Sequence, residues 1–412
     1  MTATDRADLV VVGAGTVGGW ASYFAKRSGL ERVVVLEKGF AGQGASSRAA
    51  GIVRAQGGTP ATVALGRWTI DFYNGQQAAL GTDSGFRELG YLILAVTEDD
   101  ERAGRERVAM QRGVGLDVRW LSADEAVALI PTLASGGHRG GSFVTTDGCI
   151  DPPRNVRAYS LAMQAAGVEL RERTAFTGLL LEGPARSPRV VGVETSAGPI
   201  VTERVLLTGG PSLRAVGRTA GVRIPAGAAR HTVCVLEPHE AFEVERMPMV
   251  FDIGEGLYWR LEEGGLLFGW SDPDEAPGEA RSVNWPMYDK VRARLEALVP
   301  ITRGLGIRKI WAATIDYTPD HLPILGPALG ADGVRIDGVT VASPGGHGMM
   351  WGPGVARVAA DLVVNGTTDL VDVADLGLDR FDEHGRSRFA SDPIALPFPL
   401  TADEDEAASV TR

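Results

Sequence analysis

Three glycines near the N-terminus have the spacing of a turn that holds a phosphate group. Gly13, Gly15 and Gly18 follow a short apolar run, and a helical pattern begins directly after them. The first glycine allows a tight turn, the second lets the backbone approach a pyrophosphate, and the third lets helix and strand pack closely. The unpaired N–H groups at the helix start attract the phosphate charge. Glu37 follows the next apolar run, where a carboxylate accepts hydrogen bonds from ribose hydroxyls. This pattern predicts a dinucleotide site.

The stretch that follows, residues 38–58, indicates which dinucleotide binds. It is rich in small and polar residues and has no strand pattern, whereas an NAD-binding unit continues with another helix and strand. A loop of this length inside a compact domain usually has a function. We expect it to line an extended pyrophosphate and flavin, with Lys38, Ser46 and Ser47 among the cofactor-binding residues. Because a carboxylate at Glu37 also repels a 2′-phosphate, we expect FAD and not NADP.

A second glycine-rich motif, "SPGGHGMMWGPGVA" (343–356), lies near the other end of the chain. It precedes a regular apolar pattern that predicts a helix. Five glycines clear side chains from this backbone just where a helix begins, so we expect a ligand to approach it closely.

Apolar periodicity and helix start signals predict the elements that must position these residues. Helices are expected over 59–80 and 152–166, the second started by prolines. Ser122 and Glu125 form a capping box before a further helix. Runs with period 2 within 221–312 predict the strands of an antiparallel sheet.

Together these segments resemble the FAD-dependent amine and amino-acid oxidoreductases of the D-amino acid oxidase superfamily, notably sarcosine oxidase β subunits and dimethylglycine dehydrogenases. The resemblance covers most of residues 8–380. It is carried by the GAGTVGG turn with Glu37 and by four further segments: "ASSRAAGIVR", "GLYWRLEEGGLLFGWSDP", "WAATIDYTPDHLPILGP" and "SPGGHGMMWGPGVA".

The resemblance implies an α/β fold combined with antiparallel β structure. An FAD-binding Rossmann-like domain of the glutathione reductase type would carry an inserted mixed-sheet substrate domain. We assign residues 1–85, 147–220 and 316–380 to the FAD-binding domain, residues 86–146 and 221–315 to the substrate domain, and residues 381–412 to a C-terminal tail that packs along the surface.

The resemblance also implies further FAD contacts. The backbone at Ala175 would meet the adenine, and Gly209 would lie in a turn beside the cofactor. A loop would lie against the pyrimidine end of the flavin, where backbone N–H groups hold the negative charge of the reduced ring. Five residues would form that loop: Gly345, Gly346, His347, Gly348 and Met349.

Four residues are candidates for the chemistry. By the same resemblance, Arg54 matches an arginine that binds the substrate carboxylate in sarcosine oxidases, and Arg260 lies on the strand expected to face the flavin. Arginine suits a carboxylate through its bidentate fork; a surface or structural ion pair is an equal alternative for each. Tyr258 lies on a strand expected to face the flavin. His347 could face the substrate or could only cap its own turn.

Three departures from the family pattern shape the prediction. Ala313 stands where monomeric sarcosine oxidases have a cysteine bonded to the flavin, so we expect noncovalent FAD. Met350 replaces a lysine that binds carboxylate, which suggests a larger or less anionic substrate. Leu267 replaces a lysine that activates oxygen, which suggests a dehydrogenase or a slow oxidase.

Two neighbouring residues bear on the substrate. Ile315 stands where glycine and D-amino acid oxidases have an arginine, which weighs against a D-amino acid oxidase proper. Asp316 could help to hold a cationic amine, or it could be a turn or ion-pair residue.

Composition excludes several classes of function. The 412-residue chain has a formal charge of −11 and no polybasic run, which argues against a nucleic-acid partner. No apolar run reaches the roughly 18 residues that span a membrane. Without a recognisable signal peptide, we expect a cytoplasmic protein whose two cysteines, Cys149 and Cys234, are free thiols. No metal-site motif is present.

The residues and the resemblance together predict an FAD-dependent oxidoreductase. It would oxidise the C–N bond of a secondary or tertiary amine or an N-alkyl amino acid by hydride transfer to flavin N5, with oxygen or a protein as electron acceptor. The alternatives are a D-amino acid or 2-hydroxy acid dehydrogenase on the same fold, and a flavin-binding subunit of a larger electron-transfer complex.

Overall fold

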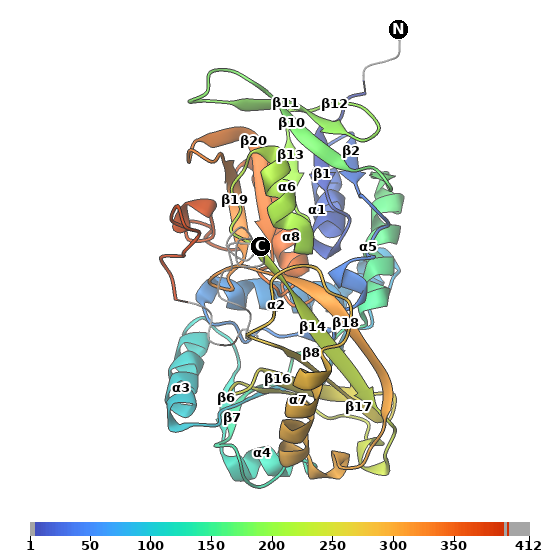
Figure 1. The fold of residues 1–412 in the computed structure, drawn as a ribbon, viewed down its shortest axis with the longest axis vertical. Coiled ribbons are helices and arrows are strands. Elements are labelled where there is room, and N and C mark those ends of the chain that lie inside the picture. The colour runs from blue at the N-terminus through green and yellow to red at the C-terminus, as the bar shows by residue number, and fades with distance from the viewer. Residues whose placement is uncertain (1–4, 391–393, 395–412) are drawn as a thin grey trace, which may run out of the picture.

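The computed structural model describes residues 5–390 and 394, and it shows two large sheets, one above the other in Figure 1. Within the described residues the first sheet has nine strands. Seven of them lie in the order β10 (Phe176–Glu182), β11 (Arg189–Thr195), β20 (Arg335–Ser343), β13 (Val205–Leu207), β1 (Leu9–Val12), β2 (Val33–Leu36) and β9 (Glu169–Arg171). The other two are β12 (Ile200–Val201), which pairs with β11, and β19 (Ile324–Leu329), which pairs with β20.

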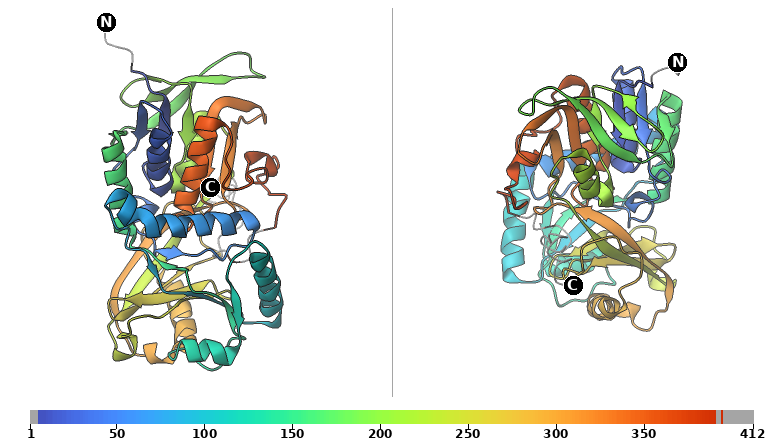
Figure 2. Two further views of the ribbon diagram at one scale, coloured as in Figure 1. Left: turned by 180° about the vertical axis from the view of Figure 1, so that it is seen from behind. Right: turned by 45° about the horizontal axis from the view of Figure 1, so that its top comes forward.

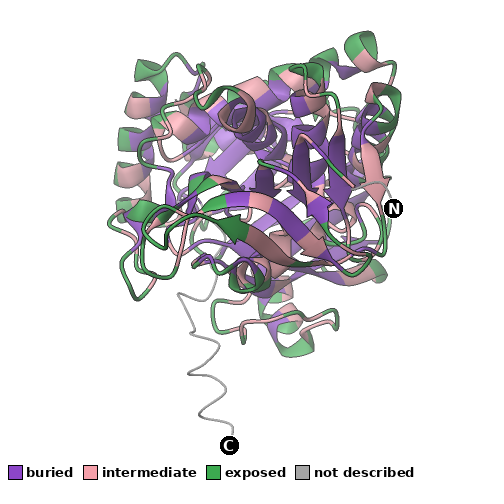
Figure 3. Cartoon of the chain, turned by 90° about the horizontal axis from the view of Figure 1, so that it is seen from above, coloured by how far each residue is buried: buried purple, intermediate pink, exposed green. Residues whose placement is uncertain are grey.

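The centre of this sheet is parallel and buried on both faces. β20, β13, β1, β2 and β9 pair in parallel, which explains why β1 and β2 are unbroken apolar runs. On the face of Leu9 and Val11 lie three helices: α1 (Thr16–Arg27), α5 (Pro152–Ala166) and α8 (Gly352–Asn365). The short helix α6 (Leu213–Ala220) packs on the opposite face, with Val10 and Val12. Figure 3 shows these central strands as a buried layer.

The second sheet has eight strands in the described part of the chain and is mostly antiparallel. Its order is β18 (Ile307–Tyr317), β14 (Gly227–Leu236), β17 (Gly265–Ser271), β16 (Leu257–Glu262), β15 (Met249–Asp252), β5 (Tyr91–Leu94), β7 (Gly141–Val144) and β6 (Arg119–Leu121). One face packs against α4 (Ala123–Leu129) and α7 (Trp285–Leu298). α3 (Glu98–Gly113) lies beside β6 and β7.

The remaining elements lie where the two sheets meet. The long helix α2 (Pro60–Leu80) runs across this boundary, as Figure 2 shows from behind. A small sheet of β3 (Ile52–Val53), β8 (Gly148–Cys149) and β4 (Arg87–Glu88) lies near it. Short 3-10 turns complete the connections: η1 (Ala45–Ser47), η2 (Gly210–Ser212), η3 (Glu240–Phe242), η4 (Pro300–Thr302) and η5 (Leu378–Arg380).

The structure confirms the local predictions. α2 follows Thr59, whose hydroxyl accepts from the Thr62 N–H, and α5 begins at Pro152. α4 carries the expected capping box between Ser122 and Glu125. Both cysteines are free and buried. The described residues contain no helix that is both long and apolar enough to span a bilayer.

The C-terminal tail differs from the prediction at one described position. Ile394 was expected to pack along the surface, but its side chain is only 2% exposed and lies in an apolar cluster with Tyr91 and Tyr258. An apolar side chain near the chain end gains more from filling an interior gap than from lying in water. Most of the remaining tail lies outside the described residues.

Candidate active site

A cavity of about 340 Å³ lies at the carboxyl ends of the parallel strands and reaches the second sheet. This edge is where open parallel sheets bind ligands, because the loops after neighbouring strands converge there. The residues that follow β1, β2, β13 and β20 line the cavity: Gly13, Glu37, Thr208 and Pro344. From the second sheet, Tyr258, His231 and Ala313 line it.

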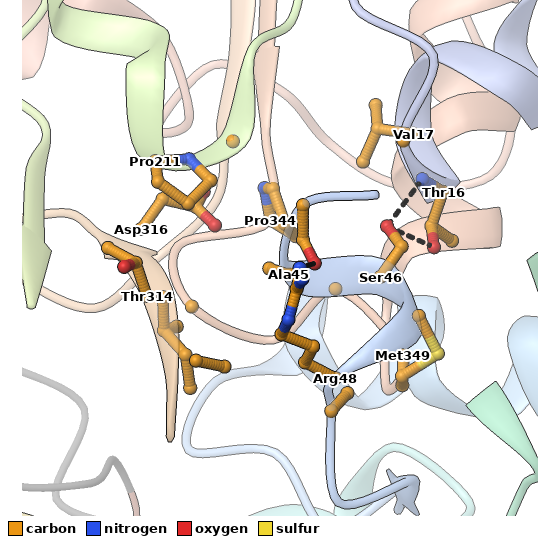
Figure 4. A pocket seen from close by; sticks show the side chains of 18 of the residues that line it. Thr16, Val17, Ala45, Ser46, Arg48, Pro211, Thr314, Asp316, Pro344 and Met349 are labelled. Carbon is orange, nitrogen blue, oxygen red and sulfur yellow. Dashed lines mark hydrogen bonds between the residues drawn. The ribbon is translucent and has the colours of Figure 1, made fainter. Parts of the chain in front are cut away.

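The start of α1 forms an anion site at one end of the cavity. Gly15 supplies no side-chain cap, and no acidic residue occupies the first turn. The Thr16 N–H and hydroxyl both donate to Ser46 Oγ, at 3.0 and 3.1 Å (Figure 4). A Cβ at Gly18 would lie 1.9 Å from the Gly13 carbonyl oxygen, so only glycine lets α1 pack this closely on the turn. The helix N-terminus and the adjacent hydroxyls suit a pyrophosphate.

The Glu37 carboxylate is held rigidly beside this anion site. Its two oxygens accept from the N–H groups of Ala14 and Gly39, at 3.0 and 2.8 Å. Each oxygen keeps a lone pair for a ribose hydroxyl. Lys38, Ala175 and Gly209 line the same cavity.

The C-terminal glycine motif forms another wall, a segment that we call the glycine loop (344–349). Gly345 and Gly346 have φ values of +60° and +93°, which side chains disfavour. Gly346, His347, Gly348 and Met349 line the cavity, and α8 begins shortly afterwards without a side-chain cap. Among the hydrogen bonds of the described residues, the N–H groups of Gly348 and Met349 have no acceptor. The uncapped start of α1, the Glu37 carboxylate with lone pairs left for hydroxyl groups, and the free amides of the glycine loop together fit FAD.

Arg54 brings a buried positive charge to the cavity. Its side chain is 2% exposed and donates to the carbonyls of Gln56 and Ile394, the latter at 2.8 Å. Within the described part of the chain, no carboxylate forms an ion pair with it. The buried Asp147 carboxyl interacts with its charge without forming a direct ion pair. A buried guanidinium without a direct ion pair is costly, and Arg54 still has N–H donors to spare. It therefore suits an anionic ligand.

Beside Arg54 the cavity wall carries a pair of buried rings. His231 Nε2 lies 2.6 Å from Tyr258 Oη, and His231 Nδ1 lies 2.9 Å from Ser271 Oγ. Burial lowers the pKa of His231 to about 3 and raises the pKa of Tyr258. Burial, with the charge of Arg54, also lowers the pKa of His347. All three rings are therefore neutral at physiological pH.

Two predicted site residues lie away from the cavity. Arg260 donates to the carbonyls of Ala50 and Leu261, at 3.0 and 2.8 Å, and pairs with Glu262. Arg260 does not line the cavity. The alternative of a structural ion pair therefore fits it better than binding of a substrate carboxylate. Ser47 also lies outside the lining, although Ser46 belongs to it.

Two lining residues escaped the sequence reasoning. Arg48, the arginine of the "SSR" run, lines the cavity together with Ser46, which precedes it by two residues. It therefore adds a positive charge on the same side as the anion site. His231 lies on β14 and meets Tyr258 only because β14 and β16 both pair with β17. No pattern in the sequence near His231 predicts its contact with Tyr258.

The positions that depart from the family pattern divide between cavity and core. Ala313, Ile315 and Met350 line the cavity. Leu267 is 1% exposed, packs in an apolar cluster with Tyr258 and is absent from the lining.

Comparison with known proteins identifies curated relatives along almost the whole chain. It is 29% identical to 4-methylaminobutanoate oxidase (formaldehyde-forming) of Paenarthrobacter nicotinovorans, over 92% of this chain and 46% of that protein. It is 27% identical to the sarcosine oxidase subunit beta of Rhodobacter capsulatus, over 92% of this chain and 89% of that subunit. The chain thus spans about half the length of the first relative and most of the second.

Solved structures share the fold. Glycine oxidase from Geobacillus kaustophilus is 25% identical, with a TM-score of 0.76 over 92% of this chain and all of that one. L-proline dehydrogenase from P. horikoshii is 24% identical, with a TM-score of 0.79 over 89% of this chain and 96% of that one. These likenesses confirm the predicted fold class. The family model for FAD dependent oxidoreductases (DAO) matches residues 8–362, so the chain belongs to this family of FAD-dependent enzymes.

Proposed function

We propose that this enzyme oxidises the C–N bond of an N-alkyl amino acid, a secondary or tertiary amine that carries a carboxylate. The observation that carries the proposal is Arg54, a buried cation at the cavity wall that forms no direct ion pair with a carboxylate among the described residues, although the Asp147 carboxyl lies near enough to feel its charge. The two relatives, 4-methylaminobutanoate oxidase and the sarcosine oxidase subunit, are named for substrates of this kind. The chemistry supplied by bound FAD would be that of a hydride acceptor for the carbon beside the nitrogen.

Arg54 would anchor the substrate carboxylate. Its guanidinium donates to two backbone carbonyls and contacts the Tyr91 hydroxyl, which leaves N–H groups for a charge-assisted bond to an anion. Because those partners fix the plane of the guanidinium, the carboxylate would be held in one orientation and the amine in one place.

Tyr258 and His231 would orient the amine and would not deprotonate it. A histidine with a pKa of about 3 is far too weak a base for an ammonium group. The role of His231 would instead be to hold the Tyr258 hydroxyl at a fixed position, while Ser271 holds the other ring nitrogen of His231. The substrate would therefore lose its ammonium proton to water before oxidation.

The lining also supports the finer proposals on cofactor and acceptor. The lining contains Ala313 and no cysteine, in keeping with noncovalent FAD. Met350 enlarges the apolar part of the wall, so we propose a substrate larger than sarcosine. Leu267 lies in the apolar core outside the lining and brings no cation to the cavity, so we propose slow reaction with oxygen.

The test is anaerobic flavin reduction with matched substrates. The parent and Arg54→Met are mixed with N-methyl amino acids and with the same amines lacking the carboxylate, and the flavin band is followed. We expect Arg54→Met to lose roughly a hundredfold in kcat/KM on the acids, about 3 kcal/mol for a charged hydrogen bond, and little on the plain amines. Arg260→Lys is the control, because Arg260 lies outside the cavity, and it should behave as the parent on both series.

Other outcomes would redirect the proposal. Bleaching only by D-amino acids or 2-hydroxy acids would replace C–N oxidation of N-alkyl amines with one of those reactions. Equal losses on acids and plain amines would show that Arg54 binds no carboxylate. No reduction by any substrate, with a purified chain that associates with other proteins, would favour an electron-transfer subunit.

A further inference from the structure

Asp316 is a buried acid at the cavity wall, and the proposed reaction gives it no role. It lies on β18, is 5% exposed and lines the cavity near Pro211, Thr314 and Pro344 (Figure 4). Burial raises the pKa of its carboxyl. Within the described residues, no arginine or lysine forms an ion pair with it, so an ion-pair role does not explain its position.

The distance along β18 argues against a role in holding the substrate amine. His231 pairs with Ala313, while Asp316 pairs with Ala228 three residues further on. At roughly 3.3 Å per residue, Asp316 lies about 10 Å along the strand from the Tyr258–His231 pair. One small amine cannot contact both.

A short chain of hydrogen bonds connects Asp316 to the glycine loop. The Ser343 hydroxyl donates to Asp316 Oδ2 at 3.0 Å, and the Gly345 N–H donates to Ser343 Oγ at 3.2 Å. Ser343 is the last residue of β20, and Gly345 has the left-handed φ at which the chain turns. This connection fixes the turn that leads to Gly348 and Met349, whose N–H groups have no acceptor among the described residues.

We propose that Asp316 is a positioning residue that holds the glycine loop through Ser343 and thereby tunes the affinity and potential of the bound flavin. The free amides of the glycine loop stabilise negative charge only if they keep their direction. Asp316 accepts the Ser343 hydroxyl and leaves its oxygen to receive the Gly345 N–H. The inference concerns the cofactor and holds whichever substrate the enzyme oxidises.

The test measures FAD dissociation constants and flavin midpoint potentials. Asp316→Ala removes one hydrogen bond of the connection and Ser343→Ala removes both. We expect each variant to weaken FAD binding about three- to tenfold. Ser343→Ala also lowers the midpoint potential, because a looser loop holds the reduced flavin's charge less well. The double variant is no worse than the single ones, since both break one connection. A purely structural role would not move the potential.

Conservative variants and a control complete the experiment. Ser343→Thr keeps a hydroxyl and Asp316→Asn keeps an acceptor oxygen, so both retain the parent's FAD affinity, and neither lowers the potential. Thr340→Ala, on the same strand, leaves both quantities unchanged. Unchanged affinity and potential in Ser343→Ala, or additive losses in the double variant, would overturn the proposal. If Asp316→Ala does not fold, Ser343→Ala and Asp316→Asn decide alone.

Discussion

His231 shows how a single buried residue links the site to stability. Its pKa falls from the ordinary 6.5 to about 3 because burial disfavours the imidazolium. In the unfolded chain the same side chain takes up a proton near pH 6.5. Between pH 6.5 and about 3 the unfolded state therefore binds more protons, and the free energy of unfolding decreases as the pH falls.

This leads to a prediction on acid sensitivity. His231→Gln should remove this contribution, so the variant should lose less stability than the parent between pH 6.5 and 4.5. The difference is at most about 1.4 kcal/mol per pH unit. Urea unfolding at several pH values measures it. His384→Gln, which changes an exposed histidine, should follow the parent curve; equal slopes for the parent and His231→Gln would show that His231 is not buried as a neutral ring.

At the scale of elements, the turn between β1 and α1 has almost no spare room. A Cβ at Gly18 would lie 1.9 Å from the Gly13 carbonyl oxygen and 3.0 Å from Thr208 Oγ1. Gly18→Ala must push α1 away from β1 and spoil the anion site. We expect at least a tenfold weaker FAD affinity, measured by fluorescence titration of the apoprotein. Gly75→Ala, in α2 where an added Cβ meets no atom, is the matched control and should keep the parent's affinity; a parent-like Gly18→Ala would refute the argument.

Features that depend on contacts between residues close in sequence could be predicted, whereas features that depend on distant contacts could not. The glycine turn, the Ser122 capping box and the start of α5 at Pro152 depend on residues close in sequence, and all three were predictable. Strand alternation places Tyr258 and Arg260 on one face, yet only Tyr258 lines the cavity because Arg260 meets the Ala50 carbonyl.

The contacts that decide the site's chemistry are mostly distant ones. His231 reaches Tyr258 through strand pairing, and the Ile394 carbonyl reaches Arg54 across 340 positions. No local pattern encodes either contact. The domain boundaries likewise stay a prediction, although the two sheets draw their strands from the interleaved segments that such an insertion requires.

At the scale of the whole molecule, the cavity joins the two sheets. Gly13, Glu37 and the glycine loop come from the first sheet's edge, while Tyr258 and Ala313 come from the second. A ligand bound there contacts both halves in the folded state and neither in the unfolded chain, so it stabilises the fold by mass action. With noncovalent FAD at a hundredfold excess over its Kd, this amounts to about 2.7 kcal/mol.

We therefore predict that FAD can be removed and restored. Acid precipitation should leave a yellow supernatant, because Ala313 provides no nucleophile to bond the flavin. Apoprotein prepared by gentler means should melt several degrees below the holoenzyme, and its Tm should rise with the logarithm of the added FAD concentration. AMP alone should restore only part of this rise in Tm, because it would fill the Glu37 end of the cavity and leave the second sheet without contact. Flavin that stays with the precipitate would contradict noncovalent binding. A Tm insensitive to FAD would mean that the cofactor does not bridge the two sheets.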